Sequence, residues 1–113
     1  MEFKFDLDEF LREICIKFKN LYKNNLSRII LFGSYARGDF KTESDIDIMI
    51  LVNLNERQIE DLEDYKYDIL EELSYKYPVY ISVMVYNIDY FNKWKNNMPL
   101  FKNVVKDGIY LNG

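Results

Sequence analysis

The 113-residue sequence contains no histidine and only one cysteine. Without histidine, an imidazole can serve neither as a general base nor as a metal ligand. The single cysteine, Cys15, cannot form an internal disulfide, and its solitary presence fits a reducing compartment. We therefore expect a cytoplasmic protein in which Cys15, beside the apolar stripe of a helix, is a buried and unreactive thiol.

A long basic run is also missing, because 15 Lys and Arg residues stand against 19 Asp and Glu residues and give a formal net charge of −4. Tight binding to a nucleic-acid backbone needs clustered Lys and Arg. No apolar run reaches membrane-spanning length, and no signal peptide is recognisable. We therefore expect neither a membrane segment nor nucleic acid as a direct ligand.

The sequence is rich in hydrophobic residues (49%) and in aromatic ones, with ten Tyr, eight Phe and one Trp. A chain of this length can bury roughly two-thirds of its unfolded surface in one core. No linker, repeat or low-complexity segment interrupts it, so residues 1–113 are expected to form a single domain. The aromatic content exceeds what a small core needs, which leaves open a surface for a partner or a second copy.

Apolar spacing and turn residues predict an alternation of helices and strands. The first helix has a capping box of Asp6 and Glu9, and a later short helix begins at Asn87. The expected helices span residues 7–22 and 55–77, with a short helix after residue 87 and a last helical turn between 99 and 108; the expected strands span 28–32, 46–52 and 79–86.

The most informative segment carries two acids at the start of the second expected strand. Asp45 and Asp47 project to the same side of that strand, while Ile46 and Ile48 turn inward. Two like charges this close repel each other unless a cation lies between them, and oxygen ligands suit Mg²⁺. The spacing therefore favours a metal site, although two solvated acids on an edge strand are the alternative.

A Gly-Ser turn precedes these acids at the end of the first expected strand. Gly33 allows the backbone to approach a ligand closely, and Ser34 places a hydroxyl where helix N-terminal amides can point at a phosphate. Adjacent metal and phosphate sites are typical of phosphoryl-transfer centres. The alternative is an ordinary strand-to-helix turn with Ser34 as its N-cap.

Gly33-Ser34, followed after ten residues by Asp45-Ile46-Asp47, resembles the signature of the polymerase-beta-like nucleotidyltransferase superfamily. The fuller string GSYARGDF…SDIDI resembles its smallest members, the minimal nucleotidyltransferases. This resemblance implies an α+β fold, a small mixed β-sheet with flanking helices. It also implies a Mg²⁺-dependent enzyme that transfers a nucleoside monophosphate, most simply AMP from ATP, to an acceptor hydroxyl.

The resemblance also assigns roles to individual residues. Asp45 and Asp47 would be catalytic and hold Mg²⁺. The nucleotide-binding residues implied by the motif are Gly33, Ser34, Arg37 and Ser44. Arg37 would neutralise charge that develops on the phosphates, or would instead be a structural partner of a nearby carboxylate.

The sequence departs from the family at a third carboxylate, which the resemblance places on the third strand. No acid occurs there, and Tyr80 or Ser82 takes its place. Asp39 and Glu43, on the loop before the acid pair, are either substitutes or solvated loop charges. A catalytically weak subunit that binds nucleotide and a partner is therefore the alternative to an active enzyme.

Minimal nucleotidyltransferases pair with small helical proteins of the HEPN class, and the resemblance implies such a partner here. In toxin–antitoxin pairs of this type, the nucleotidyltransferase silences a HEPN ribonuclease by adenylylating it. A homodimer is the other expected assembly. Phe91, Trp94 and Met98 follow helical spacing, and this stripe either closes the core or forms part of an interface.

Overall fold

A computed structural model describes residues 6–41 and 45–112. Its centre is a four-stranded sheet with the strand order β3-β2-β1-β4. β1 pairs in antiparallel fashion with both β2 and β4, whereas β2 and β3 are parallel. The strands are β1 (Leu26–Phe32), β2 (Ile46–Val52), β3 (Ile81–Asn87) and β4 (Ile109–Tyr110). The expected α+β fold with a small mixed sheet is confirmed.

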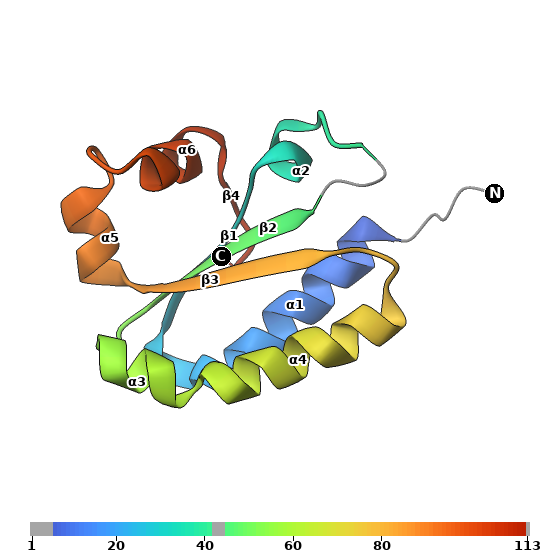
Figure 1. The fold of residues 1–113 in the computed structure, drawn as a ribbon, viewed down its shortest axis with the longest axis horizontal. Coiled ribbons are helices and arrows are strands. Elements are labelled where there is room, and N and C mark those ends of the chain that lie inside the picture. Colours follow the sequence, from blue (N-terminus) through green and yellow to red (C-terminus); the bar gives the residue numbers. More distant parts are fainter. Residues whose placement is uncertain (1–5, 42–44, 113) are drawn as a thin grey trace.

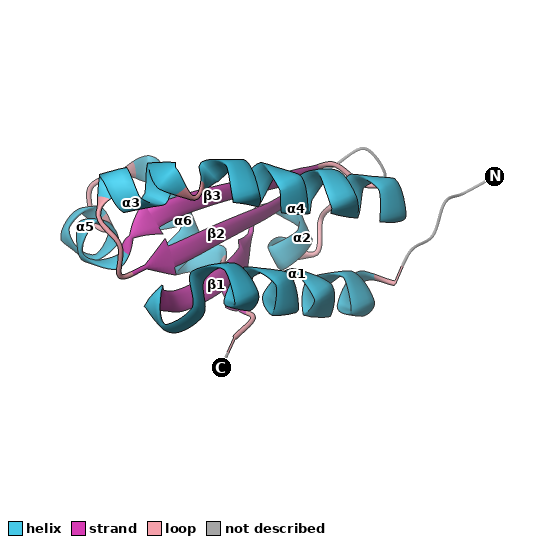
Figure 2. Ribbon diagram, turned by 90° about the horizontal axis from the view of Figure 1, so that it is seen from below, coloured by secondary structure: helices cyan, strands magenta, loops and turns pink. Residues whose placement is uncertain are grey.

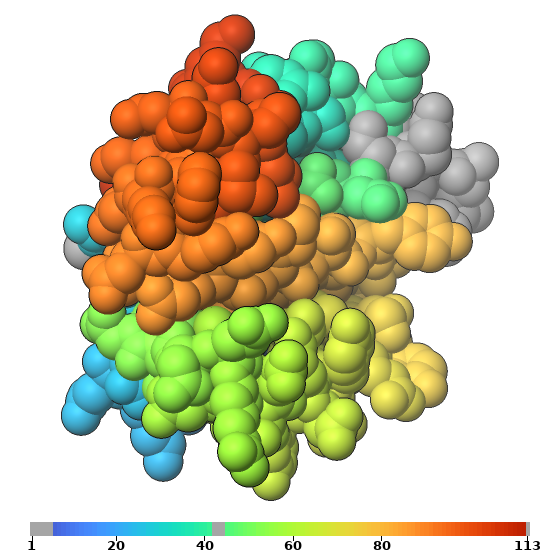
Figure 3. All heavy atoms as spheres, turned by 60° about the vertical axis from the view of Figure 1, so that its left-hand side comes forward, coloured from blue at the N-terminus to red at the C-terminus, as the bar shows by residue number. Residues whose placement is uncertain are grey.

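Helices cover both faces of this sheet. The helices are α1 (Leu7–Tyr22), followed by a 3-10 turn (Lys23–Asn25), then α2 (Ser34–Arg37), α3 (Glu56–Asp61), α4 (Glu63–Lys76), α5 (Ile88–Trp94) and α6 (Pro99–Asp107). Figure 1 shows α1 and α4 below the sheet and α5 and α6 above it, and Figure 2 shows α1 beside α4 across the lower face. In Figure 3, β3 reaches the surface between these two layers.

The strand β2 is buried on both faces, as its apolar sequence predicts. Ile46, Ile48 and Ile50 pack into one cluster with the buried residues of α1 and α4. Met49 and Leu51 face the other way, into a second cluster with residues of α5 and α6. The two clusters bury β2 on both sides. Asp47, near its start, lies on the face of the second cluster.

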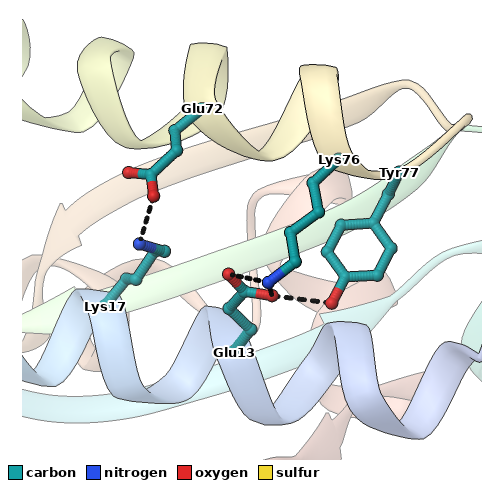
Figure 4. Close-up of polar contacts among 5 residues, drawn as sticks. All are labelled: Glu13, Lys17, Glu72, Lys76 and Tyr77. Carbon is teal, nitrogen blue, oxygen red and sulfur yellow. Dashed lines mark hydrogen bonds and ion pairs between the residues drawn. The ribbon is translucent and has the colours of Figure 1, made fainter.

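Ion pairs join α1 to α4 across their outer surface (Figure 4). Lys17 Nζ lies 2.9 Å from Glu72 Oε1, and Lys76 Nζ lies 3.1 Å from Glu13 Oε2. The Tyr77 hydroxyl donates to Glu13 Oε2 at 2.6 Å, and this bond raises the pKa of Tyr77 to about 12. The same bond lowers the pKa of Glu13. Since exposed pairs contribute little, the partly buried Tyr77–Glu13 bond is the stronger tie.

Several expected elements are confirmed. The first helix spans Leu7–Tyr22, and the Asp6 side chain accepts a hydrogen bond from the Glu9 N–H at 3.1 Å. The second strand has the expected bounds, and Asn87 caps α5. Cys15 was expected to be buried and is half-buried, against the first cluster, and burial raises the pKa of its thiol.

The single helix expected over residues 55–77 is wrong, because the chain forms α3 and α4 with a break at Leu62. Within α4, Tyr65 is 59% exposed, while the neighbouring Lys66 is buried. The Lys66 ammonium lies 2.7 Å from Glu63 Oε2 and donates to the Val83 carbonyl at 3.3 Å. A buried lysine with its charge satisfied cannot be recognised from an apolar pattern.

The expectation that Phe91, Trp94 and Met98 form one stripe on a single helix is also wrong. α5 ends at Trp94, and Met98 is the residue before α6. Phe91 is buried, whereas Trp94 is 39% exposed. Trp94 therefore does not close the core, and a homodimer through this region stays a prediction.

Three strands also differ from expectation. β1 begins at Leu26 and β3 at Ile81, and β4 was not expected. β4 is only two residues long, too short for a period-two pattern. Its place is set by pairing with β1, extended by the Leu111 N–H, which donates to the Ile29 carbonyl at 2.8 Å. In the ranges 6–41 and 45–112, no helix is both long and apolar enough to cross a membrane.

Candidate functional site

The Gly-Ser turn is a single helical turn bounded by two glycines. Gly33 follows β1 with φ 76° and ψ −155°, a conformation that is essentially restricted to glycine. Gly38 ends the turn with φ 82°, and its N–H donates to the Ser34 carbonyl at 2.9 Å. The half-buried Ser34 is therefore the first residue of α2, and only Gly33 separates it from Phe32, the last residue of β1.

The acid pair lies against this turn. Asp47 is paired in register with Phe32 of β1, the residue before Gly33. A Cβ atom on Gly33 would lie 2.5 Å from Asp47 Oδ2. The structure thus brings Gly33 and Asp47 into direct contact. Two features require glycine at position 33: the positive φ and the carboxylate beside it.

The two carboxylates differ in exposure and interact with each other. Asp45 is exposed and Asp47 is half-buried, while Ile46 between them is fully buried on the opposite face. Burial, reinforced by the neighbouring charge of Asp45, raises the pKa of Asp47, and Arg37 lowers it in part. The two acids lie close enough for their charges to interact, and the positive charge of Arg37 does not offset the burial of Asp47.

Arg37 projects from α2 toward two further acids. Its Nε lies 3.2 Å from Asp39 Oδ2, and its Nη1 lies 3.8 Å from Asp107 Oδ2. The Arg37 side chain remains 44% exposed. The sequence did not indicate that Asp107, at the end of α6, pairs with Arg37, because a single acid 70 residues away gives no local signal. Asp39, one candidate for the missing carboxylate, is engaged with Arg37.

Of the two residues expected in place of the third acid, Ser82 lies beside the pair. Ser82 is the register partner of Asp47 on β3. Tyr80 lies just before β3 and is 77% exposed. Glu43 and Ser44 lie outside the described residues. Within the described ranges, no group of three acidic, cysteine or histidine side chains comes together as a metal site.

A prediction follows from the contact between Gly33 and Asp47. Gly38→Ala meets no atom within 4 Å and should cost about 1–2 kcal/mol of unfolding free energy, the usual penalty of a left-handed backbone for alanine. Gly33→Ala should cost more, since the added Cβ also collides with the carboxylate. Urea denaturation of both variants tests this order.

The same pair of residues supplies a control. In an Asp47→Ala background, Gly33→Ala should cost less than in the wild type, because the backbone strain remains but the collision is gone. Equal costs in both backgrounds would show that the collision has no energetic effect.

The raised pKa of Asp47 leads to a prediction on pH. Ionisation of Asp47 destabilises the fold at pH values above its raised pKa, and this cost is absent below the ordinary value of 3.8, where the carboxyl is protonated both folded and unfolded. Asp47→Asn should therefore raise the free energy of unfolding at neutral pH. The gain should shrink as the pH falls through the raised pKa.

Urea denaturation over a pH series measures this difference. Asp64→Asn, an exposed carboxylate on α4, is the control and should change stability little at any pH. A gain for Asp47→Asn that grows on acidification would contradict the prediction.

Comparison with known proteins adds sequence relatives. A family model described as "Nucleotidyltransferase domain" matches residues 7–110. "Putative protein adenylyltransferase MJ0604" of Methanocaldococcus jannaschii is 39% identical over 101 residues, which are 89% of this chain and 93% of that protein. "Putative protein adenylyltransferase MJ1305" of the same organism is 34% identical, over 88% of this chain and 81% of that protein.

Solved structures share the fold. A crystal structure of a toxin–antitoxin with AMP-PNP aligns with a TM-score of 0.60 at 21% identity, covering 91% of this chain and 73% of that chain. A tri-AMPylated HEPN toxin of Shewanella oneidensis in complex with an MNT antitoxin aligns with a TM-score of 0.55 at 19% identity, covering 94% and 71%. Since the family model matches nearly all of the described residues, the chain belongs to the nucleotidyltransferase domain family and is a nucleotidyltransferase.

Proposed function

We propose that this enzyme transfers AMP from ATP to a hydroxyl group of a protein, in a reaction that requires Mg²⁺. The observation that carries the proposal is the contact of Asp47 with the Gly33 turn, with the charge of Asp45 close enough to raise the pKa of Asp47. Adenylyl transfer to a protein is the activity named for the relatives from Methanocaldococcus jannaschii. AMP-PNP in one structural neighbour supports ATP as the donor.

The donor set at the start of β2 fits Mg²⁺. Asp45 and Asp47 offer hard oxygen ligands, and the raised pKa of Asp47 shows that the protein alone does not neutralise the pair. When bound, Mg²⁺ would supply positive charge that stabilises the phosphate oxygens during transfer. Two protein ligands leave room for phosphates and water, as is usual for this ion.

The remaining site residues would bind and orient the nucleotide. Gly33 leaves the backbone accessible beside Asp47, and the Ser34 hydroxyl can donate to a phosphate oxygen. Arg37 is held at the rim by Asp39 and Asp107, and its guanidinium can turn to the charge that develops on the leaving pyrophosphate. Ser44 belongs to the nucleotide site in this proposal, on the motif alone.

The proposed acceptor is a HEPN-type partner, with this chain acting as the antitoxin. One structural neighbour is an MNT antitoxin in complex with a tri-AMPylated HEPN toxin. The alignment covers 94% of this chain and 71% of the chain in that structure. A protein substrate also agrees with a site at the rim of the sheet, where Asp45 is exposed.

A second candidate function is a nucleotide-binding subunit with little activity. It is favoured by Ser82, which lies beside Asp47 where the resemblance implies a carboxylate. A serine hydroxyl is a poor proton acceptor at neutral pH, and loss of a positioned base typically costs ~10²–10⁴-fold in rate. Slow transfer with intact nucleotide binding distinguishes this candidate.

The metal assignment predicts the effect of removing either charge. Asp45→Asn and Asp47→Asn should each sharply weaken Mg²⁺-dependent binding of a non-hydrolysable ATP analogue, because one charged ligand is lost with little change in volume. Isothermal titration calorimetry with and without Mg²⁺ measures this effect, and Asp64→Asn on α4 is the matched control. Unchanged affinity in both site variants would overturn the metal assignment.

The position of Ser82 gives a prediction on rate. Ser82→Asp would place a carboxylate beside Asp47 and should speed adenylyl transfer by up to ~10²–10⁴-fold if a missing base limits the reaction. Ser82→Asn, of the same size but uncharged, should not. Single-turnover release of pyrophosphate from labelled ATP is the measurement. A wild type that is already fast, and that Ser82→Asp slows, would show that the reaction needs no acid at this position.

A further inference from the structure

Tyr80 lies just before β3, the strand that pairs with β2 beside the acid pair. Its carbonyl accepts a hydrogen bond from the Ile46 N–H at 2.9 Å, so the β2–β3 ladder continues one residue beyond the start of β3. Ile46 separates Asp45 from Asp47, and the backbone of Tyr80 is therefore anchored beside the two carboxylates. The Tyr80 side chain is nevertheless 77% exposed.

Strand alternation places Tyr80 on the face of the carboxylates. Ser82 is the register partner of Asp47, and Met84 is the partner of Met49. Both methionines pack into the cluster under α5 and α6, which identifies the face that these alternate residues share. Tyr80 precedes Ser82 by two residues and thus belongs to the same face. Neighbouring strands lie about 4.8 Å apart, less than the length of a tyrosine side chain.

The other tyrosines are placed differently. Tyr65, Tyr67 and Tyr75 belong to α4, which covers the opposite face of the sheet. Tyr22, Tyr35 and Tyr77 are buried. Tyr86 lies at the far end of β3, Tyr90 in α5 and Tyr110 on β4. Among the described tyrosines, Tyr80 is the one that is exposed and whose backbone is hydrogen-bonded to the start of β2.

We propose that Tyr80 is an internal acceptor, so that the enzyme adenylylates itself on this residue within one molecule. The inference rests on the proposed transfer of AMP from ATP. The Tyr80 Oη attacks the α-phosphorus and forms an Oη–P bond. The bond from that phosphorus to the oxygen bridging to the β-phosphate breaks, pyrophosphate leaves with the bridging oxygen, and the phenolic proton passes to water. The AMP then remains on the rim of the site that transferred it.

Labelling of the purified chain tests this inference without any partner. After incubation with ATP labelled in the α-phosphate and with Mg²⁺, the wild type should carry AMP, and peptide mass spectrometry should place it on Tyr80. Tyr80→Phe removes only the hydroxyl and should lose the label. Tyr75→Phe is the matched control, because Tyr75 is 84% exposed but lies on α4, and it should keep the label.

Two outcomes overturn the proposal: a wild type without label, or a Tyr80→Phe variant labelled like the wild type. Calorimetry of the wild type with the ATP analogue separates these failures from a failure of the proposed function. Binding without labelling rejects Tyr80 alone, whereas absence of Mg²⁺-dependent binding rejects both.

A dilution series tests whether the transfer stays within one molecule. The rate of labelling per chain should be independent of protein concentration. A rate that rises in proportion to concentration would overturn the intramolecular route.

Discussion

The antiparallel register of β1 and β2 is the constraint on which the site depends. It sets Phe32 opposite Asp47, so the turn that follows β1 must pass directly over the carboxylate. Only a residue without a side chain fits there, because a Cβ atom would lie 2.5 Å from Asp47 Oδ2. The Gly-Ser turn and the acids, more than ten residues apart in sequence, are thereby held together by the sheet itself.

The buried side of β2 makes that register robust. Ile46, Ile48 and Ile50 are fully buried against α1 and α4. A slip by one residue would turn these side chains into the second cluster and turn Asp47 toward the face that α1 and α4 cover. Keeping Asp47 half-buried next to another carboxylate is unfavourable, and the packing of the isoleucines on the opposite face offsets this free-energy cost. Strained functional sites are commonly stabilised by their surroundings in this way.

Features with a local cause could be predicted from the sequence. The N-cap at Asp6, the apolar stripe of α1 and the apolar run of β2 each follow from residues close in the chain. The contact between Gly33 and Asp47 could be predicted only because the whole motif resembles that of the nucleotidyltransferases.

Features that depend on distant segments were missed. Asp107 reaches Arg37 from the end of α6, and β4 owes its place to pairing with β1. The break at Leu62 accompanies a buried Lys66, whose ammonium is satisfied by Glu63 and by a strand that comes later in the chain. Local patterns contain none of these partners, and so the sequence alone could not place them.

Lys66 also determines how the free edge of the sheet can be used. In a parallel ladder, alternate residues of β3 turn their backbone groups toward β2, and the residues between them turn away. Tyr80 bonds to β2, so Val83 presents its carbonyl to the outer edge, and the Lys66 ammonium occupies that carbonyl. A foreign strand could extend the sheet here only by displacing a buried, ion-paired ammonium. The Lys66 ammonium therefore disfavours pairing of another strand with the middle of β3.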